Sequence, residues 1–361
     1  MITIIGAGPA GCHTACLLAR AGKEVQIFEE HNKIGEPAHC TGIVTSSIKN
    51  IIRIKNDLVI NEVDKVKIFS PNKKFIELKL KNKNLILDRK KFDNYLADLA
   101  VKEGTKIFLG YRFMDYKDKK IRLKYESGNE VFSKTGYLIG ADGPLSQVAR
   151  SCNLFGKRRF MTGVQARVKL KNENSVEFYP FIGNFSWVVP ENEEIVRLGV
   201  AAYDKVKEHF DNFLKLKKID KKKIIETQGG LIPLYNPKIK TERENVFLVG
   251  DAATQIKATT GGGIIQGLIG AKCLAEAIVK NKDYNREWKK RLARELWLHL
   301  KIREILDKFK EKDWNFLINL FNKEKNKGVI EKFDRDHISK FFFRMALNEP
   351  KLLYFLKYLY K

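Results

Sequence analysis

Residues 1–11, Met-Ile-Thr-Ile-Ile-Gly6-Ala-Gly8-Pro-Ala10-Gly11, place a G-x-G-x-x-G motif directly after a short apolar run. Gly6 permits a tight turn, Gly8 lets a pyrophosphate approach the backbone, and Gly11 lets a helix pack closely on the first strand. The small apolar residues from Ala10 onward predict that helix, whose positive N-terminus faces the pyrophosphate. The stretch therefore predicts a dinucleotide site that uses Gly6, Gly8, Ala10 and Gly11.

A second strand is expected at residues 25–28, Val-Gln-Ile-Phe, because Gly22 ends the preceding helix. Glu29 follows this strand at the spacing where a carboxylate accepts hydrogen bonds from an adenosine ribose. Glu30 is the neighbouring alternative for the same task. The second strand and its acidic residue favour a bound dinucleotide over a glycine turn without a ligand.

Two later stretches each predict a buried strand that ends in glycine and aspartate. They are Gly140-Ala-Asp142-Gly143 and Val249-Gly250-Asp251. Asp251 is expected to accept hydrogen bonds from a ribityl chain. The segment Gly261-Gly262-Gly263-Ile264 then leads into another helix, whose N-terminal dipole favours the negative charge that a reduced flavin carries on its pyrimidine ring.

In this order, the three stretches resemble the fingerprints of FAD-dependent oxidoreductases of the p-hydroxybenzoate hydroxylase fold. The resemblance covers residues 1 to about 285. It implies FAD as the cofactor, held by residues of all three stretches, Asp142 among them, and contacted by Arg89. The sequence holds no second strand-linked G-x-G-x-x-G and no C-x-x-x-x-C pair, which excludes disulfide reductases with two dinucleotide domains.

The expected fold class is α/β, with a Rossmann-type FAD-binding domain, an inserted antiparallel-sheet substrate domain and C-terminal helices. Continuous apolar strands beside the glycine motifs are typical of a parallel sheet, and alternating segments elsewhere are typical of antiparallel strands. An amphipathic helix is expected at residues 89–103. The expected domains are an FAD-binding domain at 1–55, 85–155 and 240–285, a substrate domain at 56–84 and 156–239, and a C-terminal helical region at 286–361.

Two further stretches resemble the geranylgeranyl reductase family, in particular archaeal digeranylgeranylglycerophospholipid reductases. Gly35-Glu-Pro-Ala-His39-Cys40-Thr-Gly42 is similar to the cysteine-bearing loop of that family, and Phe185-Ser-Trp187-Val-Val-Pro190 is similar to its Y-x-W-x-F-P segment. Phe185 and Val189 stand where tyrosine and phenylalanine are usual, and Lys257 stands where proline is common. The resemblance implies an apolar prenyl pocket lined by Phe185, Trp187 and Pro190.

The same resemblance implies a reductase that saturates double bonds of geranylgeranyl chains, with archaeal ether lipids as the expected substrate. Free diphosphates and quinone tails are the alternative substrates. Saturating an alkene takes a hydride equivalent, which reduced FAD supplies, and a proton from an acid shielded from water. Cys40 is expected near the flavin, where it shapes the alkene site or donates that proton, and His39 is the rival donor. The electron donor is expected to be NADPH or a ferredoxin-like protein.

The charge balance is strongly basic: 68 Lys and Arg against 43 Asp and Glu give a formal net charge of +25. Such a surface attracts polyanions, and an anionic membrane surface is the expected partner, with lysines spread over solvated faces as the alternative. Nucleic acid is not expected, because no binding module accompanies the charge. Near the C-terminus, Leu352, Phe355, Leu356 and Leu359 share one face of an expected helix, which either lies in a membrane interface or docks on the protein body.

The start of the chain does not resemble a secretory signal, and no apolar run approaches about 18 residues. A cytoplasmic protein is therefore expected, on the inner face of the cell membrane if it is peripheral. Five scattered cysteines indicate neither a disulfide framework nor a metal site. Two other functions stay open: a flavin-dependent monooxygenase or halogenase of the same fold, and a flavin-bound sensor or lipid-binding protein without turnover.

Overall fold

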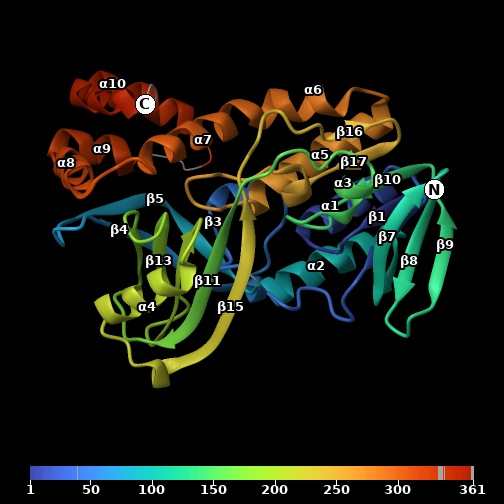
Figure 1. The fold of residues 1–361 in the computed structure, drawn as a ribbon, viewed down its shortest axis with the longest axis horizontal. Helices are drawn as coiled ribbons and strands as arrows, with labels where there is room; N and C mark the ends of the chain where they lie inside the picture. Colours follow the sequence, from blue (N-terminus) through green and yellow to red (C-terminus); the bar gives the residue numbers. More distant parts are fainter. Residues whose placement is uncertain (39, 332–335, 337, 359–361) are drawn as a thin grey trace. The chain divides into compact units, whose positions relative to one another are not determined.

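A computed structural model describes residues 1–38, 40–331, 336 and 338–358. Figure 1 shows the fold with its helix and strand labels. The described chain forms two compact units, each built from segments that are far apart in the sequence. The first unit contains Met1–Ala38, Arg89–Arg159 and Pro233–Trp297, and the second contains the described residues of 39–88, 160–232 and 298–361.

The first unit is built on a six-stranded sheet with the strand order β16-β17-β10-β1-β2-β6. Neighbouring strands are parallel from β17 to β6, and the edge strand β16 runs antiparallel to β17. The central strand β1 is buried along its whole length, as an apolar strand of a parallel sheet requires. The strands are β1 (Ile2–Ile5), β2 (Val25–Glu29), β6 (Lys106–Leu109), β10 (Tyr137–Gly140), β16 (Glu242–Arg243) and β17 (Val246–Leu248).

Helix α1 begins at Pro9, directly after the glycine turn, and packs against both α2 and α5. The amphipathic helix expected at residues 89–103 is confirmed, because α2 spans Arg89–Lys102. The other helical segments of this unit are α1 (Pro9–Arg20), α3 (Gln147–Ser151), η4 (Gly250–Ala253), α5 (Ile264–Lys280), α6 (Tyr284–Trp288) and the π-helical turn η5 (Lys289–Ala293).

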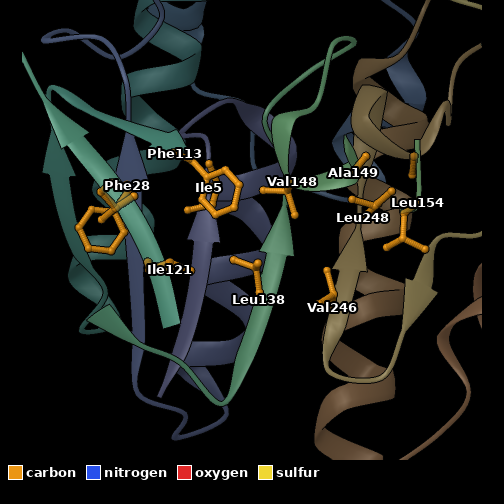
Figure 2. Packing of buried hydrophobic residues seen from close by; sticks show 12 residues of the cluster. Ile5, Phe28, Phe113, Ile121, Leu138, Val148, Ala149, Leu154, Val246 and Leu248 are labelled. Carbon is orange, nitrogen blue, oxygen red and sulfur yellow. The ribbon is translucent and has the colours of Figure 1, made fainter. Parts of the chain in front are cut away.

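A hydrophobic cluster joins the parallel sheet to a small antiparallel sheet (Figure 2). Ile5, Leu138 and Leu248 come from β1, β10 and β17, and Phe113 and Ile121 come from the small sheet. Burying such a side chain contributes about 1.5–3 kcal/mol. The cluster therefore packs along the three parallel strands from which the glycine loops leave. The small sheet contains β7 (Tyr111–Lys117), β8 (Lys120–Tyr125) and β9 (Glu130–Lys134).

The second unit is built on an eight-stranded sheet with the order β15-β11-β14-β13-β12-β4-β5-β3. From β11 to β3, neighbouring strands are antiparallel, except that β12 is parallel to β4. The strands are β3 (Ile43–Val44), β4 (Val59–Phe69), β5 (Phe75–Leu87), β11 (Phe160–Lys169), β12 (Ser175–Tyr179), β13 (Phe185–Pro190), β14 (Ile195–Ala202) and β15 (Ile224–Pro233).

Helix α4 covers one face of this sheet. Its Phe210 and Phe213 pack on Val196, Leu198 and Val200, which alternate along β14 and point to the same side. Their neighbours along β14 point to the opposite face, which carries two of the expected substrate residues, Phe185 and Trp187. The helical segments before the C-terminal region are η1 (Ser46–Asn50), η2 (Asn56–Leu58), α4 (Val206–Leu216) and η3 (Lys221–Lys223).

Among the C-terminal helices, α8 and α9 pack directly on β5 within the second unit. Ile76 and Leu78 of β5 form a buried cluster with Ile318, Ile330 and Met345. None of the helices in the described ranges is long and apolar enough to span a bilayer. The helical segments of the C-terminal region are α7 (Arg294–Leu306), α8 (Glu311–Phe321), α9 (Glu324–Glu331), α10 (Ile338–Asn348) and η6 (Pro350–Tyr358).

The expected fold class is confirmed: a mostly parallel α/β unit accompanies a mostly antiparallel sheet. The compact units and the expected domains differ at several boundaries, most of all at residues 40–55 and 286–297. Residues 40–55 fall in the second unit, because Ile43 of β3 pairs with Ile86 of β5. The C-terminal region is also split, since residues up to Trp297 belong to the first unit.

Candidate functional site

The first glycine loop has the geometry that its sequence predicts. Gly6 adopts a φ of +100°, and a Cβ there would lie 2.5 Å from the carbonyl oxygen of Ala141. A Cβ on Gly11 would lie 2.1 Å from the carbonyl oxygen of Gly6. Gly8 differs, because a Cβ there would meet no atom within 4 Å. Gly6 and Gly11 are thus required for packing, whereas Gly8 leaves open space beside the N-terminus of α1.

The three glycine stretches meet within the first unit. Gly6 of the first stretch approaches Ala141 of the second so closely that only glycine fits. A Cβ on Gly250 of the third stretch would lie 2.9 Å from the Cβ of Ala10. The chain thus brings together loops that are more than a hundred residues apart, as one cofactor site requires.

Glu29 lies against the first loop. Its Oε2 accepts a hydrogen bond from the backbone nitrogen of Ala7 at 2.7 Å, and its Oε1 lies 2.6 Å from Nδ1 of His31. Glu30, the alternative, has a more exposed side chain and lies 3.8 Å from Arg112. Of the two carboxylates, Glu29 is therefore the one that the structure places beside the glycine turn.

Asp251 presents a carboxylate beside the start of α5. A Cβ on Gly263 would lie 2.7 Å from Oδ1 of Asp251, so the glycine is needed there. Burial raises the pKa of Asp251 to about 6, and the nearby charge of Arg89 opposes the rise. No hydrogen bond to this carboxylate is found in the part of the chain that the structure describes. Asp251 is therefore available to accept hydrogen bonds from a ligand.

Arg89 stands at the first position of α2 and is held by Asp93 one turn later. Its Nε and Nη2 donate to the two carboxylate oxygens of Asp93 at 2.9 and 2.8 Å. This bidentate pairing fixes the guanidinium. The charge of Arg89 also opposes the rise that burial causes in the pKa of Asp251, and its role at the cofactor stays a prediction. Asp93 was not predicted from the sequence, although its spacing of four residues from Arg89 on one helix indicates an ion pair.

The carboxylate of Asp142 is engaged by residues that follow it in the chain. Its carboxylate accepts hydrogen bonds from Oγ of Ser146 at 2.6 Å and from the backbone nitrogen of Val148 at 3.0 Å. Burial raises its pKa, and these hydrogen bonds oppose the rise. The carboxylate therefore holds the start of α3. Asp142 remains a predicted cofactor residue. It would act through its backbone or through the shape of its loop, because its carboxylate is already hydrogen-bonded.

The start of α5 is a tight glycine turn without a side-chain cap. The backbone nitrogen of Lys257 donates to the carbonyl oxygen of Gly262 at 3.1 Å, and α5 begins at Ile264. Neither Gly263 at the start of α5 nor Gly8 at the start of α1 supplies a side-chain hydrogen bond to its helix. Helix N-termini of this kind bind negatively charged groups.

Arg158 is a residue of this site that sequence reasoning missed. Its Nη2 donates to the carbonyl oxygen of Ala252 at 2.8 Å, and its Nη1 donates to that of Pro144 at 3.3 Å. It therefore ties the loop after β10 to the loop after β17. Burial lowers the pKa of Arg158 to about 10. Its place in the basic run Lys157-Arg158-Arg159 suggests a solvated side chain, so the sequence holds no signal of this role.

In the second unit, β13 places the three expected substrate residues on two faces. Phe185 and Trp187 point to the same side, with ring centroids 5.7 Å apart. Pro190 pairs with Val196, whose side chain lies on the face covered by α4. The structure therefore brings Phe185 and Trp187 together and turns the side chain of Pro190 to the other side of the sheet.

Trp187 lies directly over Gly199 of β14. A Cβ on Gly199 would lie 2.3 Å from Cζ2 of Trp187, so the glycine makes room for the indole. The Nε1 of Trp187 is buried and, among the described residues, has no hydrogen-bond partner. On the other side of Gly199 lies Gln165 of β11, whose Nε2 donates to Gln228 at 2.8 Å. This face of the sheet is thus mainly aromatic at β13 and polar at β11.

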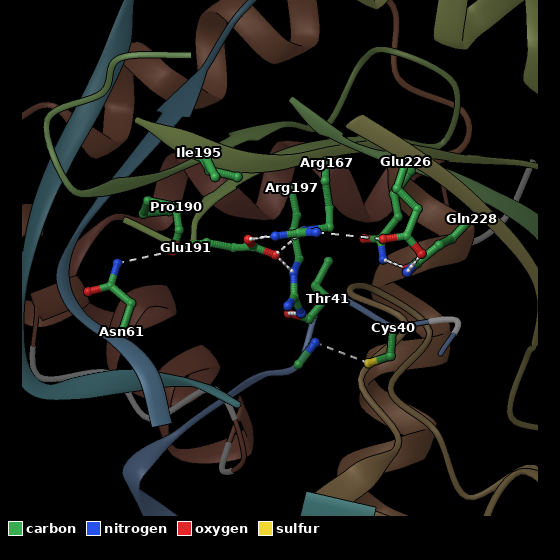
Figure 3. Close-up of polar contacts among 12 residues, drawn as sticks. Cys40, Thr41, Asn61, Arg167, Pro190, Glu191, Ile195, Arg197, Glu226 and Gln228 are labelled. Carbon is green, nitrogen blue, oxygen red and sulfur yellow. Dashed lines mark hydrogen bonds and ion pairs between the residues drawn. The ribbon is translucent and has the colours of Figure 1, made fainter. Parts of the chain in front are cut away.

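Cys40 belongs to the second unit and lies in a loop that is tied to β14 (Figure 3). The backbone nitrogen of Gly42 donates to Sγ of Cys40 at 3.3 Å. Nη1 of Arg197 donates to the carbonyl oxygen of Thr41 at 2.7 Å. His39, the rival proton donor, lies outside the described residues. The described residues contain no group of side chains that could hold a metal ion.

The residues of the first unit fit FAD. The open space at Gly8, the free carboxylate of Asp251 and two helix N-termini without side-chain caps are the groups that a dinucleotide with a ribityl chain would engage. The family model of the FAD binding domain matches residues 1–194. The chain therefore belongs to the FAD binding domain family, and FAD is its cofactor.

A second family model, that of the lycopene cyclase protein, matches residues 187–340. The chain is 29% identical to the digeranylgeranylglycerophospholipid reductase of Methanocaldococcus jannaschii over 99% of this chain and 97% of the relative. This similarity confirms the resemblance expected from the sequence.

Solved structures show the same fold. A geranylgeranyl bacteriochlorophyll reductase-like protein from Thermoplasma acidophilum matches with a TM-score of 0.84 and 22% identity, over 99% of this chain and 98% of that one. A flavin-dependent brominase matches with a TM-score of 0.70 and 16% identity, over 97% of this chain and 99% of the brominase chain. The higher TM-score belongs to the reductase-like fold, and both similarities concern the fold alone.

Proposed function

We propose that the protein is an FAD-dependent reductase that saturates double bonds of geranylgeranyl chains, with archaeal ether lipids as its substrate. The observation that carries this proposal is the similarity to a digeranylgeranylglycerophospholipid reductase over almost the full length of both chains. The paired aromatic side chains of Phe185 and Trp187 support an apolar substrate such as a prenyl chain. Free prenyl diphosphates and quinone tails share this chain chemistry.

The first unit holds the cofactor in the proposed mechanism. Gly6, Gly8, Ala10 and Gly11 form the turn at the pyrophosphate, Glu29 binds the ribose, and Asp251 binds the ribityl chain. Gly261 to Ile264 present the N-terminus of α5, and its dipole stabilises negative charge. Arg89 adds a fixed positive charge, because Asp93 holds its guanidinium. When bound and reduced, FAD supplies the hydride equivalent.

The second unit supplies the surroundings of the alkene. Phe185 and Trp187 exclude water from an apolar chain, and Pro190 shapes the strand that carries them. Cys40 is the proposed proton donor, since cysteine is one of the side chains that act as general acids. His39 is the alternative donor. Cys40→Ala with FAD retained should lower turnover, and unchanged turnover would remove Cys40 from the chemistry.

The proposed electron donor is NADPH or a ferredoxin-like protein. An anaerobic experiment separates the reduction of FAD from its use. The protein is reduced with dithionite and mixed with a digeranylgeranylglycerol phospholipid in detergent. Return of the absorbance of oxidised FAD supports the proposal. The control repeats the experiment with the saturated lipid, and the same return of absorbance there would show that FAD is not oxidised by the double bonds.

A flavin-dependent monooxygenase or halogenase is the second candidate, and the fold similarity to a brominase supports the halogenase. The two functions differ in what they consume. A halogenase needs molecular oxygen and a halide for product formation, whereas the proposed reductase works without either. Oxygen uptake that depends on bromide and an aromatic substrate would favour the halogenase.

We also propose that the protein acts at an anionic membrane surface, for which η6 provides a suitable segment. In a 3-10 helix, residues three positions apart lie on the same face. Leu352 and Phe355 pack on the second unit, whereas Leu353 and Leu356 are 53% and 43% exposed. The segment is thus docked on the protein body and still presents a second apolar face.

Basic and aromatic side chains accompany this exposed face. Lys351 is exposed, and Nζ of Lys357 lies 3.3 Å from the ring centroid of Tyr354. Lys308 donates to the carbonyl oxygen of Tyr358 at 2.8 Å, which places another positive charge at the end of η6. Lysines beside aromatic and apolar side chains are typical of segments that lie in the interface of an anionic membrane.

A further inference from the structure

The loop that carries Cys40 is held by one arginine of the sheet (Figure 3). Nη1 of Arg197 donates to the carbonyl oxygen of Thr41 at 2.7 Å, and Nε of the same side chain donates to Oε1 of Glu191 at 2.6 Å. One guanidinium therefore joins the loop to a carboxylate at the end of β13. Because Arg197 is only 12% exposed, water competes little for these hydrogen bonds.

Glu191 is itself fixed from a second side. Nε and Nη2 of Arg167 lie 2.9–3.1 Å from its carboxylate oxygens. Burial raises the pKa of Glu191, but the hydrogen bonds and charges of Arg167 and Arg197 outweigh burial and leave the pKa lowered. The carboxylate therefore stays ionised at neutral pH. It holds the guanidinium of Arg197 in one direction, toward Thr41.

Gly42, the next residue of the loop, packs closely against Leu87 and Arg197. Its φ is +71°, and a Cβ would lie 2.4 Å from the carbonyl oxygen of Leu87 and 3.2 Å from Nη1 of Arg197. Its own carbonyl oxygen accepts a hydrogen bond from the nitrogen of Leu87 at 2.9 Å. The loop is thus fixed at Thr41 and at Gly42, and the nitrogen of Gly42 contacts Sγ of Cys40.

We propose that Arg197, oriented by Glu191, is a positioning residue that sets the place of Cys40. The inference deepens the proposed reductase function and rests on it for the role of Cys40, but the restraint on the loop does not depend on the reaction. A simpler reading is that Arg167, Glu191 and Arg197 form an ion-pair cluster that stabilises the sheet, with the loop as a neighbour. The two readings differ in what loss of the contact to Thr41 does.

Arg197→Lys separates these readings, and Arg167→Lys is its matched control. Lysine keeps the positive charge beside Glu191, but a single ammonium cannot occupy the positions of both Nε and Nη1. Thr41 then loses its donor. Arg167→Lys makes the same chemical change at the same carboxylate and leaves the contact between Arg197 and Thr41 in place.

The measurement is amide hydrogen exchange of the FAD-loaded full chain, followed by mass spectrometry of peptides that cover residues 40–44. Arg197→Lys should speed exchange in these peptides about two- to tenfold, the effect of losing one hydrogen bond. Arg167→Lys should leave it within the error of the wild type. Unchanged exchange in Arg197→Lys, or an equal increase in both variants, would overturn the proposal.

Two further readouts keep the test informative. If Arg197→Lys does not fold, Gly42→Ala tests the same contact from the loop, because the added Cβ displaces the loop from Leu87 and Arg197; unchanged exchange there contradicts the proposal. In turnover assays, Arg197→Lys should lower kcat several-fold with KM within about twofold. If the wild type shows no turnover at all, the proposed function fails, while the exchange result still decides whether Arg197 positions the loop.

Discussion

The carboxylate of Asp251 is buried without a protein hydrogen bond in the described structure, so removing its charge should stabilise the apoprotein. Burial raises its pKa to about 6 from the ordinary value of 3.8. The apoprotein therefore gains stability as the pH falls from about 6 toward 4, and the ionised form above pH 6 is the costly one. We expect Asp251→Asn to stabilise the apoprotein near pH 8 by up to about 3 kcal/mol, at about 1.4 kcal/mol for each pKa unit.

Urea unfolding of the apoprotein at several pH values measures this effect. The gain should vanish near pH 4, where Asp251 is protonated in the folded protein. FAD binding should respond in the opposite direction, because asparagine replaces an ionised acceptor by a neutral one. We expect about tenfold weaker FAD affinity, which flavin fluorescence measures. If the Asp251→Asn apoprotein is no more stable than the wild-type apoprotein near pH 8, the ionised carboxylate of Asp251 does not destabilise the fold.

Gly199 provides a second test at the residue scale, because its missing side chain leaves room for the indole of Trp187. A Cβ at Gly199 would lie 2.3 Å from the indole, and overpacking of this kind costs about 1–3 kcal/mol. We expect Gly199→Ala to lower the free energy of unfolding by that amount and to raise KM for the prenyl substrate. Gly229→Ala is the control, since its nearest contact would be 3.5 Å. Equal effects of both substitutions would argue against a special fit at Trp187.

At the scale of elements, Arg158 links the loops that follow β10 and β17. Loss of its hydrogen bonds to Pro144 and Ala252 should let the two loops separate. We expect Arg158→Met to weaken FAD binding about tenfold or more, by roughly 1–3 kcal/mol for buried acceptors left unpaired. Arg150→Met is the matched control, because Arg150 also stacks on Phe155 but bonds only within its own loop. Titration of the apoproteins with FAD should separate the two variants clearly.

Elements whose signals are local could be predicted from the sequence. The strand, turn and helix around Gly6, Gly8 and Gly11 follow from residues next to one another, and the structure confirms the close packing that this spacing predicts. Arg158 could not be found in this way, because its partner Ala252 lies 94 residues away. The restraint of Thr41 by Arg197 spans 156 residues and is equally invisible in the sequence.

For two predicted site residues, the sequence locates the strand or loop but not the direction of the side chain. The strand around Trp187 was expected, but the alternation along β13 turns Pro190 to the face covered by α4. Asp142 lies in the expected loop, yet its carboxylate serves the start of α3. Sequence patterns locate a loop or a strand, whereas the direction of one side chain depends on its three-dimensional neighbours.

The C-terminal segment differs from its expectation for a geometric reason. An α-helical period groups Leu352, Phe355, Leu356 and Leu359 on one face. The segment η6 is a 3-10 helix, in which Leu356 shares a face with Leu353 instead. Leu359 lies outside the described residues. The apolar residues therefore divide between a docked face and an exposed one.

At the scale of the whole molecule, the net charge of +25 and the exposed face of η6 predict binding to anionic membranes. Flotation with vesicles of anionic archaeal-type lipid should recover the protein, and binding should weaken as salt is raised. Leu353→Ser with Leu356→Ser should lower vesicle binding several-fold at constant charge. A matched change of two exposed residues elsewhere, Phe132→Ser with Val131→Ser, should not. Equal binding of all three proteins would remove η6 from the interaction.

The central claim is that the protein adds hydrogen to prenyl double bonds. The most direct test incubates the FAD-loaded protein, reduced by dithionite without oxygen, with a digeranylgeranylglycerol phospholipid and follows the lipid by mass spectrometry. The account predicts products that gain two hydrogen atoms at each step, with turnover lowered in Cys40→Ala and in Arg197→Lys. A lipid of unchanged mass, from protein that retains FAD and is reduced and reoxidised normally by other acceptors, would contradict it.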